Sequence, residues 1–517
     1  MTSPAVPPQV VIGVDVGTTA AKVAAFGVGA PWRHVAVREY PLLEPHPGWQ
    51  VQDPETVAAA TLAALADAVS ATRGAEVLAL SVSTAMHGLI GLDAAMTPLT
   101  PLLTWADARS APQAAALRAS GDATWVHATT GTPVHSMTPL TKLMWFTEHE
   151  PELAGRVRWW VDLKGYVLWR LTGTLATELS SASGTALLDA RARTWSEPAA
   201  RLAGVSVDRL PPVLPTTHAL GLSDDVALRV GLAPGTTVVV GAADGPLGNL
   251  GTGALGDGVV GLSLGTSGAA RMLVPAPPDV LDPALFCYAL TSDAWVVGGA
   301  VSNGGMVVRW AGSALAPDLQ GPGDDDGGPS VDERVLELAS RVPAGSDGLV
   351  MVPYLLAERA PLWDPTQPGA YLGLRRGHTR AHLVRAAVEG VALQLGLIVD
   401  RLDRLAPGGV SSVRATGGAF RAALWREVLA AVVDRPFSTV GAAEGSALGA
   451  AALGLYALGR ADTLAGALDL VQPPEESAAE LVTVGTELVA AYAAARVRVP
   501  ELVESLTAVG RLFSSPR

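Results

Sequence analysis

Two similar segments, half a chain apart, constrain the fold of this 517-residue sequence more than any other feature. Residues 10–26 contain an apolar run with Asp15 near its end, a Gly-Thr-Thr turn at 17–19, and a second apolar run. Residues 259–273 repeat this arrangement around the turn 265–268. Each segment predicts a β-hairpin. The pair indicates an internal duplication, although a chain with 56 glycines also contains Gly-Thr pairs by chance.

Helical and strand patterns alternate along the rest of the chain. We expect helices over residues 54–70, 139–150, 162–171, 304–311, 380–405 and 422–433, and strands over 77–83, 236–243, 295–299 and 412–415. This alternation is typical of the α/β class with largely buried sheets, and the length suits two or three domains. Residues 313–332 lack periodicity and are rich in Gly, Pro and Asp, so we expect a surface insertion there.

Composition and charge exclude several classes of protein. The net charge of −13 argues against nucleic acid as a partner, because phosphate binding needs a basic surface. A single cysteine, Cys287, excludes an intramolecular disulfide, and no Cys/His cluster has zinc-site spacing. The N-terminus lacks the basic region of a secretory signal, and the apolar residues are too evenly spread for a transmembrane helix. We therefore expect a cytoplasmic protein with no membrane partner.

The basic residues are almost all arginine. Of 36 basic residues only three are lysines, Lys22, Lys142 and Lys164. A coding bias explains the asymmetry, but arginine does not replace lysine where a compact ammonium is needed. The three lysines are therefore either accidents or, for at least one of them, residues with a role near a ligand.

Three glycine turns could bind phosphate groups. The first combines the backbone N–H groups of Gly17, Thr18 and Thr19 with the Asp15 carboxylate, an arrangement that suits a phosphate together with Mg²⁺. The second turn, with Gly265 and Thr266, could grip the same polyphosphate, and the third, with Gly417 and Gly418, lies between a strand and a helix. The alternative is that these glycines serve only tight turns. No Walker A motif is present.

Asp244 is the strongest candidate for a catalytic carboxylate. It follows the apolar run 236–243 and precedes a Gly-Pro turn, so it lies at the C-terminal end of a buried strand, where open α/β sheets bind ligands. A carboxylate there could accept the proton of an alcohol that attacks a phosphate. The alternative is an aspartate that only caps the next turn.

Two further segments suggest a site for a polyhydroxylated ligand. One holds Met86 and His87, and the other holds Trp105, Asp107 and Arg109. An aromatic ring stacks on the C–H face of a sugar, while an Asp and an Arg make paired hydrogen bonds to hydroxyls. A lone His or Trp is more often a core residue, so these side chains could also be packing.

Together these segments resemble the FGGY carbohydrate kinases. Two long family signatures are present: Met137-x-Pro-x-x-Lys142-Leu-x-Trp145, and Gly369-x-Tyr-x-Gly-Leu374 followed after seven residues by His382-Leu-x-x-Ala-Ala-Val-Glu389. The resemblance covers nearly the whole chain. It implies two ribonuclease-H-like domains of the actin-like ATPase superfamily with a cleft between them, residues 1–250 for the sugar and first phosphate loop and residues 251–517 for the nucleotide.

The resemblance also implies roles for individual residues. Asp244 matches the catalytic base and contacts the substrate; Asp15, Gly17, Thr18, Thr19, Gly265, Thr266, Gly417 and Gly418 match nucleotide and phosphate positions; Met86, His87, Trp105, Asp107 and Arg109 match the sugar pocket. ATP and Mg²⁺ are the implied cofactors, with Mg²⁺ at Asp15 directly or through water. The motif 444–450 follows the family pattern for a helix behind the nucleotide.

Within the family the sequence is most similar to gluconokinases, on stretches such as 83–90, 104–110, 130–135 and 241–245. The implied reaction is phosphorylation of D-gluconate to 6-phosphogluconate. A substrate carboxylate needs a cation, for which the candidates are Arg109, His87, His135 and Lys164.

Gly88, which is typical of xylulokinases, keeps a pentulose kinase open as the alternative. Gly165 and Ala431 also depart from the family pattern. A non-enzymatic actin-like switch is a remote alternative. The expected partner is a small-molecule sugar acid or sugar, and a homodimer is compatible with the sequence.

Overall fold

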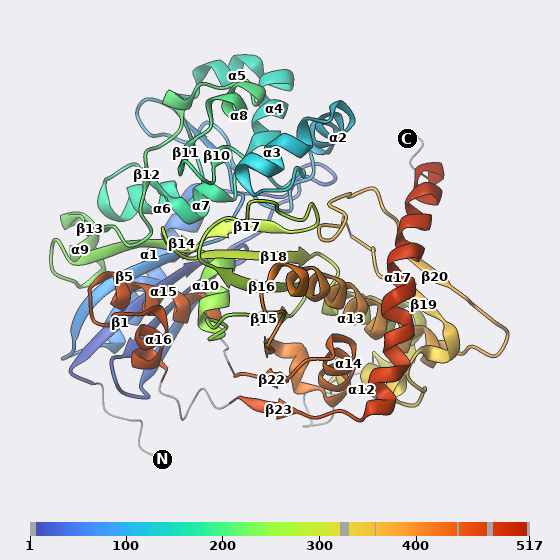
Figure 1. Cartoon of the computed structure of the whole chain (residues 1–517). Coiled ribbons are helices and arrows are strands. Elements are labelled where there is room, and N and C mark those ends of the chain that lie inside the picture. The colour runs from blue at the N-terminus through green and yellow to red at the C-terminus, as the bar shows by residue number, and fades with distance from the viewer. Residues whose placement is uncertain (1–6, 321–329, 357, 442–443, 473–478, 514–517) are drawn as a thin grey trace. The chain divides into compact units, whose positions relative to one another are not determined.

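The structure is a computed structural model that describes residues 7–320, 330–356, 358–441, 444–472 and 479–513. The chain divides into two compact units (Figure 1). Unit 1 comprises residues 1–255, 273–297 and 444–478, and unit 2 comprises residues 256–272, 298–443 and 479–517. The first change from unit 1 to unit 2 falls at residue 255, near the predicted boundary at residue 250. Residues 273–297 and 444–478 also belong to unit 1, so one boundary does not describe the division.

Unit 1 is built on a six-stranded mixed sheet with the order β13-β14-β5-β1-β2-β3. The strands are β1 (Gln9–Val16), β2 (Ala20–Gly27), β3 (Arg33–Glu39), β5 (Glu76–Thr84), β13 (Ala219–Gly221) and β14 (Thr237–Ala243). The predicted hairpin is confirmed as β1 and β2, whereas β1, β5 and β14 run parallel to one another. The residues that follow β1, β5 and β14 therefore meet at one edge of the sheet.

Helices cover both faces of this sheet. The core on one face joins α1 (Pro54–Ala71), α6 (Leu163–Thr172) and α9 (Asp224–Val230) to the strands. The other face contacts α10 (Asp244–Gly251) and α15 (Gly445–Ala457), and α16 (Leu464–Val471) packs on α15 (Figure 1). A Cβ atom on Gly13 would lie 2.0 Å from the carbonyl oxygen of Ala447, so glycine is what lets α15 approach β1. The strands are apolar almost throughout because both faces are buried.

A second apolar core in unit 1 lies beside this sheet. It is formed by α2 (Ala111–Ser120), α3 (Asp122–Thr130), α4 (Pro139–His149), α5 (Pro151–Arg156) and α8 (Glu197–Leu202) with short strands. The short elements of unit 1 are β4 (Val51–Gln52), β6 (Ile90–Leu92), β7 (Leu102–Leu103), β8 (Trp159–Val161), β9 (Thr177–Glu178), α7 (Leu179–Ser183), β10 (Leu188–Asp189), β11 (Thr194–Trp195), η1 (Val207–Arg209), β12 (Val213–Leu214) and β17 (Phe286–Ala289).

Unit 2 repeats the local topology of unit 1. Strands β15 (Val259–Leu264) and β16 (Gly268–Val274) form the second predicted hairpin, and β15 pairs in parallel with β21 (Ser412–Thr416) as β1 does with β5. Strand β22 (Phe437–Thr439) continues the sheet in parallel and β23 (Glu480–Val482) in antiparallel. Each Gly-Thr turn therefore joins the strands of an equivalent hairpin, which supports the duplication expected from the sequence.

The remaining elements of the C-terminal half include the long helices. They are β18 (Trp295–Val301), α11 (Gly305–Leu315), η2 (Pro317–Leu319), α12 (Val331–Ser340), η3 (Ser346–Gly348), β19 (Val350–Val352), β20 (Ala370–Leu372), α13 (Arg380–Leu405), η4 (Gly418–Arg421), α14 (Ala423–Val433) and α17 (Thr486–Phe513). Among the described residues, α13 alone is long and apolar enough to cross a membrane, and 89% of its apolar window is buried within the protein. Such burial is typical of a core helix.

The insertion expected at residues 313–332 is partly regular structure. Helix α11 continues to Leu315, η2 follows it, and α12 begins at Val331. Ser330 and Glu333 form a capping box at the start of α12, a signal within the sequence that the lack of periodicity concealed. Residues 321–329 lie outside the described part of the chain.

Candidate active site

The carboxyl edge of the unit 1 sheet gathers polar side chains from three neighbouring strands. Asp15 lies opposite Ser83 in the register of β1 and β5, and Ser83 lies opposite Ala242 in β14. The Ser83 hydroxyl donates a hydrogen bond to Asp15 Oδ1 at 2.7 Å. Burial raises the pKa of Asp15, while the Ser83 hydrogen bond, Lys22 and Lys164 act in the opposite direction. Asp244 follows β14 by one residue, so both predicted carboxylates belong to this edge.

Hydrogen bonds to the carbonyl groups of Gly17 and Thr18, and one between Gly17 and Ala20, fix the first glycine turn. The Gly17 N–H donates to the carbonyl of Ala20 at 3.0 Å, and the Tyr40 hydroxyl donates to the Gly17 carbonyl at 2.7 Å. Gln52 Nε2 donates to the Thr18 carbonyl at 2.6 Å. Within the described residues no acceptor engages the N–H groups of Thr18 or Thr19. The geometry suits the predicted binding of an anion.

Asp244 is the first residue of α10, which places its carboxylate at the positive end of that helix. Its Oδ1 accepts a hydrogen bond from the Gly245 N–H at 2.8 Å. The Ser446 hydroxyl, at the start of α15, donates to the Asp244 carbonyl at 3.2 Å. The motif at 444–450, which the sequence placed behind the nucleotide, thus begins a helix of unit 1 that supports Asp244.

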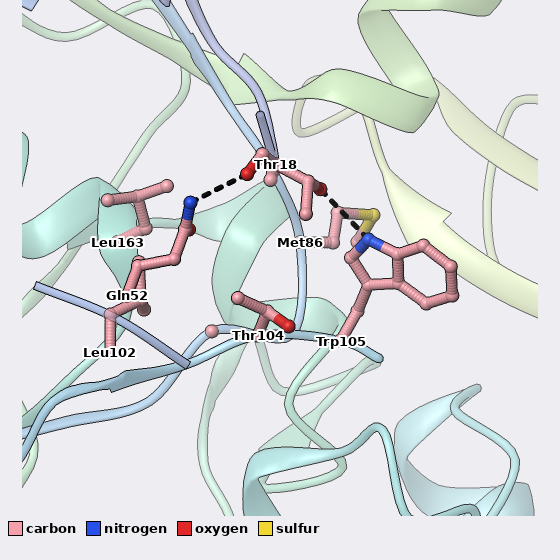
Figure 2. A pocket seen from close by; sticks show the side chains of 9 residues that line it. Thr18, Gln52, Met86, Leu102, Thr104, Trp105 and Leu163 are labelled. Atoms are coloured by element: carbon pink, nitrogen blue, oxygen red, sulfur yellow. Dashed lines mark hydrogen bonds between the residues drawn. The ribbon is translucent and has the colours of Figure 1, made fainter. Parts of the chain in front are cut away.

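A small pocket opens beside the first turn and the ends of β5 and β7 (Figure 2). It is lined by Thr18, Gln52, Ala85, Met86, Gly88, Leu102, Thr104, Trp105 and Leu163. The Trp105 indole N–H donates to the Thr18 hydroxyl at 2.9 Å, so the predicted phosphate turn and sugar loop are in direct contact. The volume of about 10 Å³ holds one water molecule, so the pocket could contain only one end of a sugar.

His87 lies between two residues that line this pocket, in a left-handed backbone conformation with φ 64°. Its Nδ1 lies 2.7 Å from the carbonyl of Gly184, which makes Nδ1 the protonated nitrogen of the neutral ring. The ring packs edge-on against Tyr288, with 5.8 Å between ring centroids. A Cβ atom on Gly184 would lie 2.5 Å from Met86 Cε, so glycine there makes room for the Met-His pair.

Asp107 and Arg109 are paired with each other and do not line this pocket, so their contact with a substrate stays a prediction. Arg109 Nε and Nη2 donate to the two oxygens of Asp107 at 2.8 and 2.9 Å. The guanidinium stacks on Trp49, 3.7 Å from the ring centroid, and its side chain is only 4% exposed. The Gln50 N–H also donates to Asp107. The pair orders the loop that carries Trp105, and its charge is already balanced.

Lys164 does not line the pocket either, and its binding of a substrate carboxylate stays a prediction. Its side chain is fully buried, and Nζ donates to the carbonyls of Val82, Val240 and Ala242. An ammonium has three protons, so these bonds use all of them. The lysine that the sequence singled out thus has three backbone carbonyls as partners in this structure.

Unit 2 contains a larger pocket of about 550 Å³. It is lined by Gly265, Thr266, Gly305, Val308, Arg309, Ser330, Asp332, Glu333, Leu336, Gly418, Ala419, Arg421, Ala422 and Trp425. The second and third predicted glycine turns therefore meet at one pocket. The N–H groups of Gly305 and Met306 donate to the carbonyls of Gly265 and Thr266, which joins the turn to α11. Arg309, Arg421 and Trp425 also line this pocket but were not predicted from the sequence, because a single Arg or Trp on a helix gives no distinguishing pattern.

Gly417 adopts a conformation that requires glycine. Its φ is 123°, and a Cβ atom would lie 2.2 Å from the carbonyl oxygen of Leu264. The third turn thus crosses the end of β15 at a distance that no side chain would allow.

A buried carboxyl group, Glu358, supports the segment that leads into α11. It is fully buried and accepts hydrogen bonds from Asn303 Nδ2 and from the Arg359 N–H, both at 2.8 Å. Burial is the largest cause that raises the pKa of Glu358 to about 7, from an ordinary value of 4.5. The folded protein therefore holds a proton there between these two pH values that the unfolded chain has lost.

We expect this site to lose stability as the pH rises. Its contribution to stability is complete below about pH 4.5 and is lost as the pH rises through about 7, a change of about 3 kcal/mol. The variant Glu358→Gln does not titrate, so the free energy of unfolding of the native protein relative to this variant should fall from pH 5 to pH 8. Urea denaturation across this range measures the difference. A constant difference would contradict the raised pKa.

Comparison with known proteins finds family models that match both halves of the chain. The model of the FGGY family of carbohydrate kinases, N-terminal domain, matches residues 10–251, and that of the C-terminal domain matches residues 260–458. The gluconokinase of Bacillus subtilis (strain 168) is 35% identical over 479 residues, covering 91% of this chain and 93% of that protein.

Two solved structures from Lactobacillus acidophilus have the same fold. A gluconate kinase superimposes with a TM-score of 0.89 and 29% identity, covering 98% of this chain and 100% of the other. A ligand-bound xylulose kinase gives a TM-score of 0.90 and 28% identity with the same coverage. Because the two family models together match most of the chain, it belongs to the FGGY family of carbohydrate kinases.

Proposed function

We propose that this protein is an ATP-dependent gluconokinase in which Asp244 is the general base. The observation that carries the proposal is the carboxyl edge of unit 1, where Asp15, the first turn, Asp244 and the Met86–Trp105 pocket come together. The similarity to the Bacillus subtilis gluconokinase supports gluconate as the sugar. A hydroxyl of the substrate would lose its proton to Asp244 as it attacks the terminal phosphate of ATP, and late proton transfer suits a base as weak as a carboxylate.

The residues present also fit a Mg²⁺ ion. Asp15 offers a partly buried carboxylate whose charged form is disfavoured by burial, and a divalent cation would favour that form. Among the described residues no cluster of three or more His, Cys, Asp or Glu side chains could hold a metal. This agrees with an ion carried mainly by phosphate oxygens and water. When bound, Mg²⁺ would neutralise charge on the transferred phosphate.

Two histidines remain as partners for a substrate carboxylate, since Arg109 and Lys164 are engaged elsewhere. His135 accepts the Met137 N–H on Nδ1 at 3.1 Å, so its neutral ring carries the proton on Nε2. His87 is the better candidate, because it is next to Met86 and Gly88, which line the pocket. The Gly184 carbonyl orients its ring and would stabilise the protonated form.

We expect His87→Asn to raise the KM for gluconate by about tenfold or more, with little change in the KM for ATP. Asparagine tolerates the left-handed backbone conformation of this position, so the loop should keep its shape. Steady-state kinetics with each substrate varied in turn measures the effect. Equal rises in both KM values would show that His87 has a general structural role.

The second candidate is a xylulose kinase, which the structural similarity to that enzyme favours. Gly88, the residue that raised this alternative, has a packing reason of its own. A Cβ atom there would lie 2.9 Å from Leu102 Cδ1 and 3.5 Å from Leu163 Cβ, so a larger residue would require the Leu102 side chain to shift. It therefore argues only weakly for a ketopentose.

ADP release by the purified protein with Mg²⁺, ATP and a panel of sugars tests the proposal. The panel comprises D-gluconate, other aldonates, D-xylulose, D-ribulose, L-ribulose and glycerol. We expect the highest kcat/KM with D-gluconate. Preference for D-xylulose would establish the second candidate, and equal ADP release without any sugar would indicate a nucleotide switch.

A further inference from the structure

The strand that leads to Asp244 contains an irregularity filled by a lysine. The register of β14 against β5 passes from Val239–Ser81 to Ala242–Ser83, so Val240 and Gly241 together oppose Val82. Gly241 has φ 75°, and a Cβ atom there would lie 1.9 Å from the Val82 carbonyl oxygen. This is a β-bulge, a feature that redirects a strand near a functional site.

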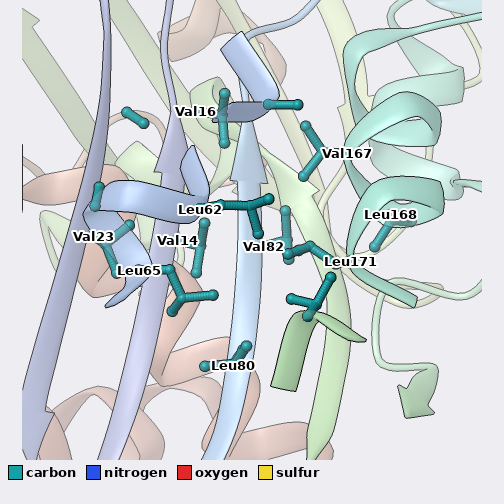
Figure 3. Packing of buried hydrophobic residues seen from close by; sticks show 14 of the residues in the cluster. Val14, Val16, Val23, Leu62, Leu65, Leu80, Val82, Val167, Leu168 and Leu171 are labelled. Atoms are coloured by element: carbon teal, nitrogen blue, oxygen red, sulfur yellow. The ribbon is translucent and has the colours of Figure 1, made fainter. Parts of the chain in front are cut away.

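Lys164 satisfies the carbonyl groups at this bulge. Its Nζ lies 2.8 Å from the Val240 oxygen and 3.0 Å from the Ala242 oxygen, and it also donates to Val82. Helix α6, which carries the lysine, packs on the sheet through Val167, Leu168 and Leu171 (Figure 3). One ammonium therefore ties β5 to the last residues of β14, two positions before Asp244.

The carboxylates that surround Lys164 include two residues of the candidate active site, Asp15 and Asp244. Glu178 Oε1 lies 3.9 Å from Nζ, and Asp162, Asp15 and Asp244 also stabilise the ammonium. Burial lowers the pKa of Lys164, and these four carboxylates oppose that change. A neutral amine donates only two hydrogen bonds, so three carbonyl bonds require the charged form.

Lys142 makes a second connection of the same kind. It is fully buried on α4, and its Nζ donates to the carbonyls of His87 at 2.6 Å and Thr104 at 2.7 Å. These residues belong to the two loops that line the sugar-side pocket, adjacent to Met86 and to Trp105. Lys142 thus adds a link between two segments that are also joined by the β-bridge between Leu89 and Leu103.

We propose that Lys142 and Lys164 are positioning residues that act through backbone carbonyls, Lys142 on the two substrate loops and Lys164 on the strand that carries the catalytic aspartate. Neither ammonium needs to touch substrate. The proposal rests on the function proposed above. It assigns Lys142 to the affinity for the sugar and Lys164 to the rate of phosphate transfer.

Lys142→Met and Lys164→Met test this division. On the sugar that the native enzyme prefers, Lys142→Met should raise KM by about tenfold with kcat within about threefold. Lys164→Met should lower kcat by about 10²-fold with sugar KM within about threefold, since a displacement near 1 Å of a reacting group has an effect of this size. Where a methionine variant is insoluble, the corresponding Lys→Gln variant, which keeps an amide donor without charge, replaces it.

Hydrogen–deuterium exchange gives a readout that needs no substrate. Lys142→Met should speed exchange in peptides covering residues 85–89 and 103–106, and Lys164→Met in peptides covering residues 80–84 and 239–245. If the native protein phosphorylates none of the sugars, the proposed function fails while exchange still decides whether the lysines position these segments.

Arg209→Met is the matched control. Arg209 Nη2 also donates to two carbonyls of unit 1, those of Ala154 and Val157, but neither belongs to a segment of the site. Its loss should lower stability and leave kcat and KM unchanged. The proposal is overturned if both lysine variants change exchange uniformly across unit 1, or if their kinetic effects match each other or the control.

Discussion

Replacing Asp244 with asparagine should lower kcat by about 10²- to 10⁴-fold, the range for loss of a positioned general base. Asparagine keeps the shape of the side chain and its hydrogen bond from the Gly245 N–H, so the start of α10 should be preserved. The amide cannot accept the proton of the attacking hydroxyl. ADP release at saturating ATP and gluconate measures kcat, and calorimetry measures the affinity for gluconate, which should survive in part.

Asp225→Asn provides the control for this variant. Asp225 also lies in the first turn of a helix of unit 1, α9, but it is exposed and this helix precedes β14, whereas Asp244 follows that strand. Its replacement should leave kcat unchanged. Full activity of Asp244→Asn would remove Asp244 from the mechanism and would leave the carboxylate edge with a binding role alone.

Replacing Glu389 with leucine should lower the free energy of unfolding by about 3–5 kcal/mol, the range for breaking one half of a buried ion pair. Glu389 is 3% exposed and accepts hydrogen bonds from Arg385 Nε at 2.8 Å and from the Tyr492 hydroxyl at 2.7 Å. Ser346 and Gly345 donate to it as well. The single substitution leaves the Arg385 charge buried without its carboxylate.

A double-mutant cycle identifies the cause of the loss. Arg385→Leu combined with Glu389→Leu removes both charges, so the double variant should be more stable than Glu389→Leu alone. The exposed pair Arg341–Glu337 at the C-terminal end of α12 has the same four-residue spacing and an N–O distance of 3.0 Å. Glu337→Leu should therefore change stability little. Urea denaturation followed by tryptophan fluorescence measures Glu389→Leu, Arg385→Leu, the double variant and Glu337→Leu, and an equal loss at positions 337 and 389 would contradict the role of burial.

The signature that contains Glu389 is explained by this network. Glu389 joins α13 to the η3 turn and to Tyr492 on α17. In the sequence this motif served only to recognise the family. In the structure its glutamate makes contacts that attach the C-terminal helix α17 to α13. The Trp145 and Lys142 positions of the first signature have a similar role beside the pocket, since Trp145 lies against Arg109.

The sequence by itself determined the local features of this protein. Strand-Gly-Thr-strand patterns are confirmed as the hairpins β1–β2 and β15–β16, because turn chemistry and apolar runs act over neighbouring residues. Asp244 was placed at the end of a strand for the same reason. The family signatures added the class of reaction.

Tertiary structure decided which side chains face the site. The sequence offered Arg109 and Lys164, together with His87 and His135, as partners for a substrate carboxylate. Only the fold shows that Asp107 and Trp49 enclose the arginine, and that three carbonyls around a β-bulge enclose the lysine. Asp107 is only two residues from Arg109, but the sequence pattern does not show that the two side chains pair with each other. Trp49 is distant in the chain from Arg109, as the three carbonyls are from Lys164, and sequence periodicity carries no information about such contacts. The same reason kept Ser446, which supports Asp244 from 202 residues away, out of the site that the sequence predicted.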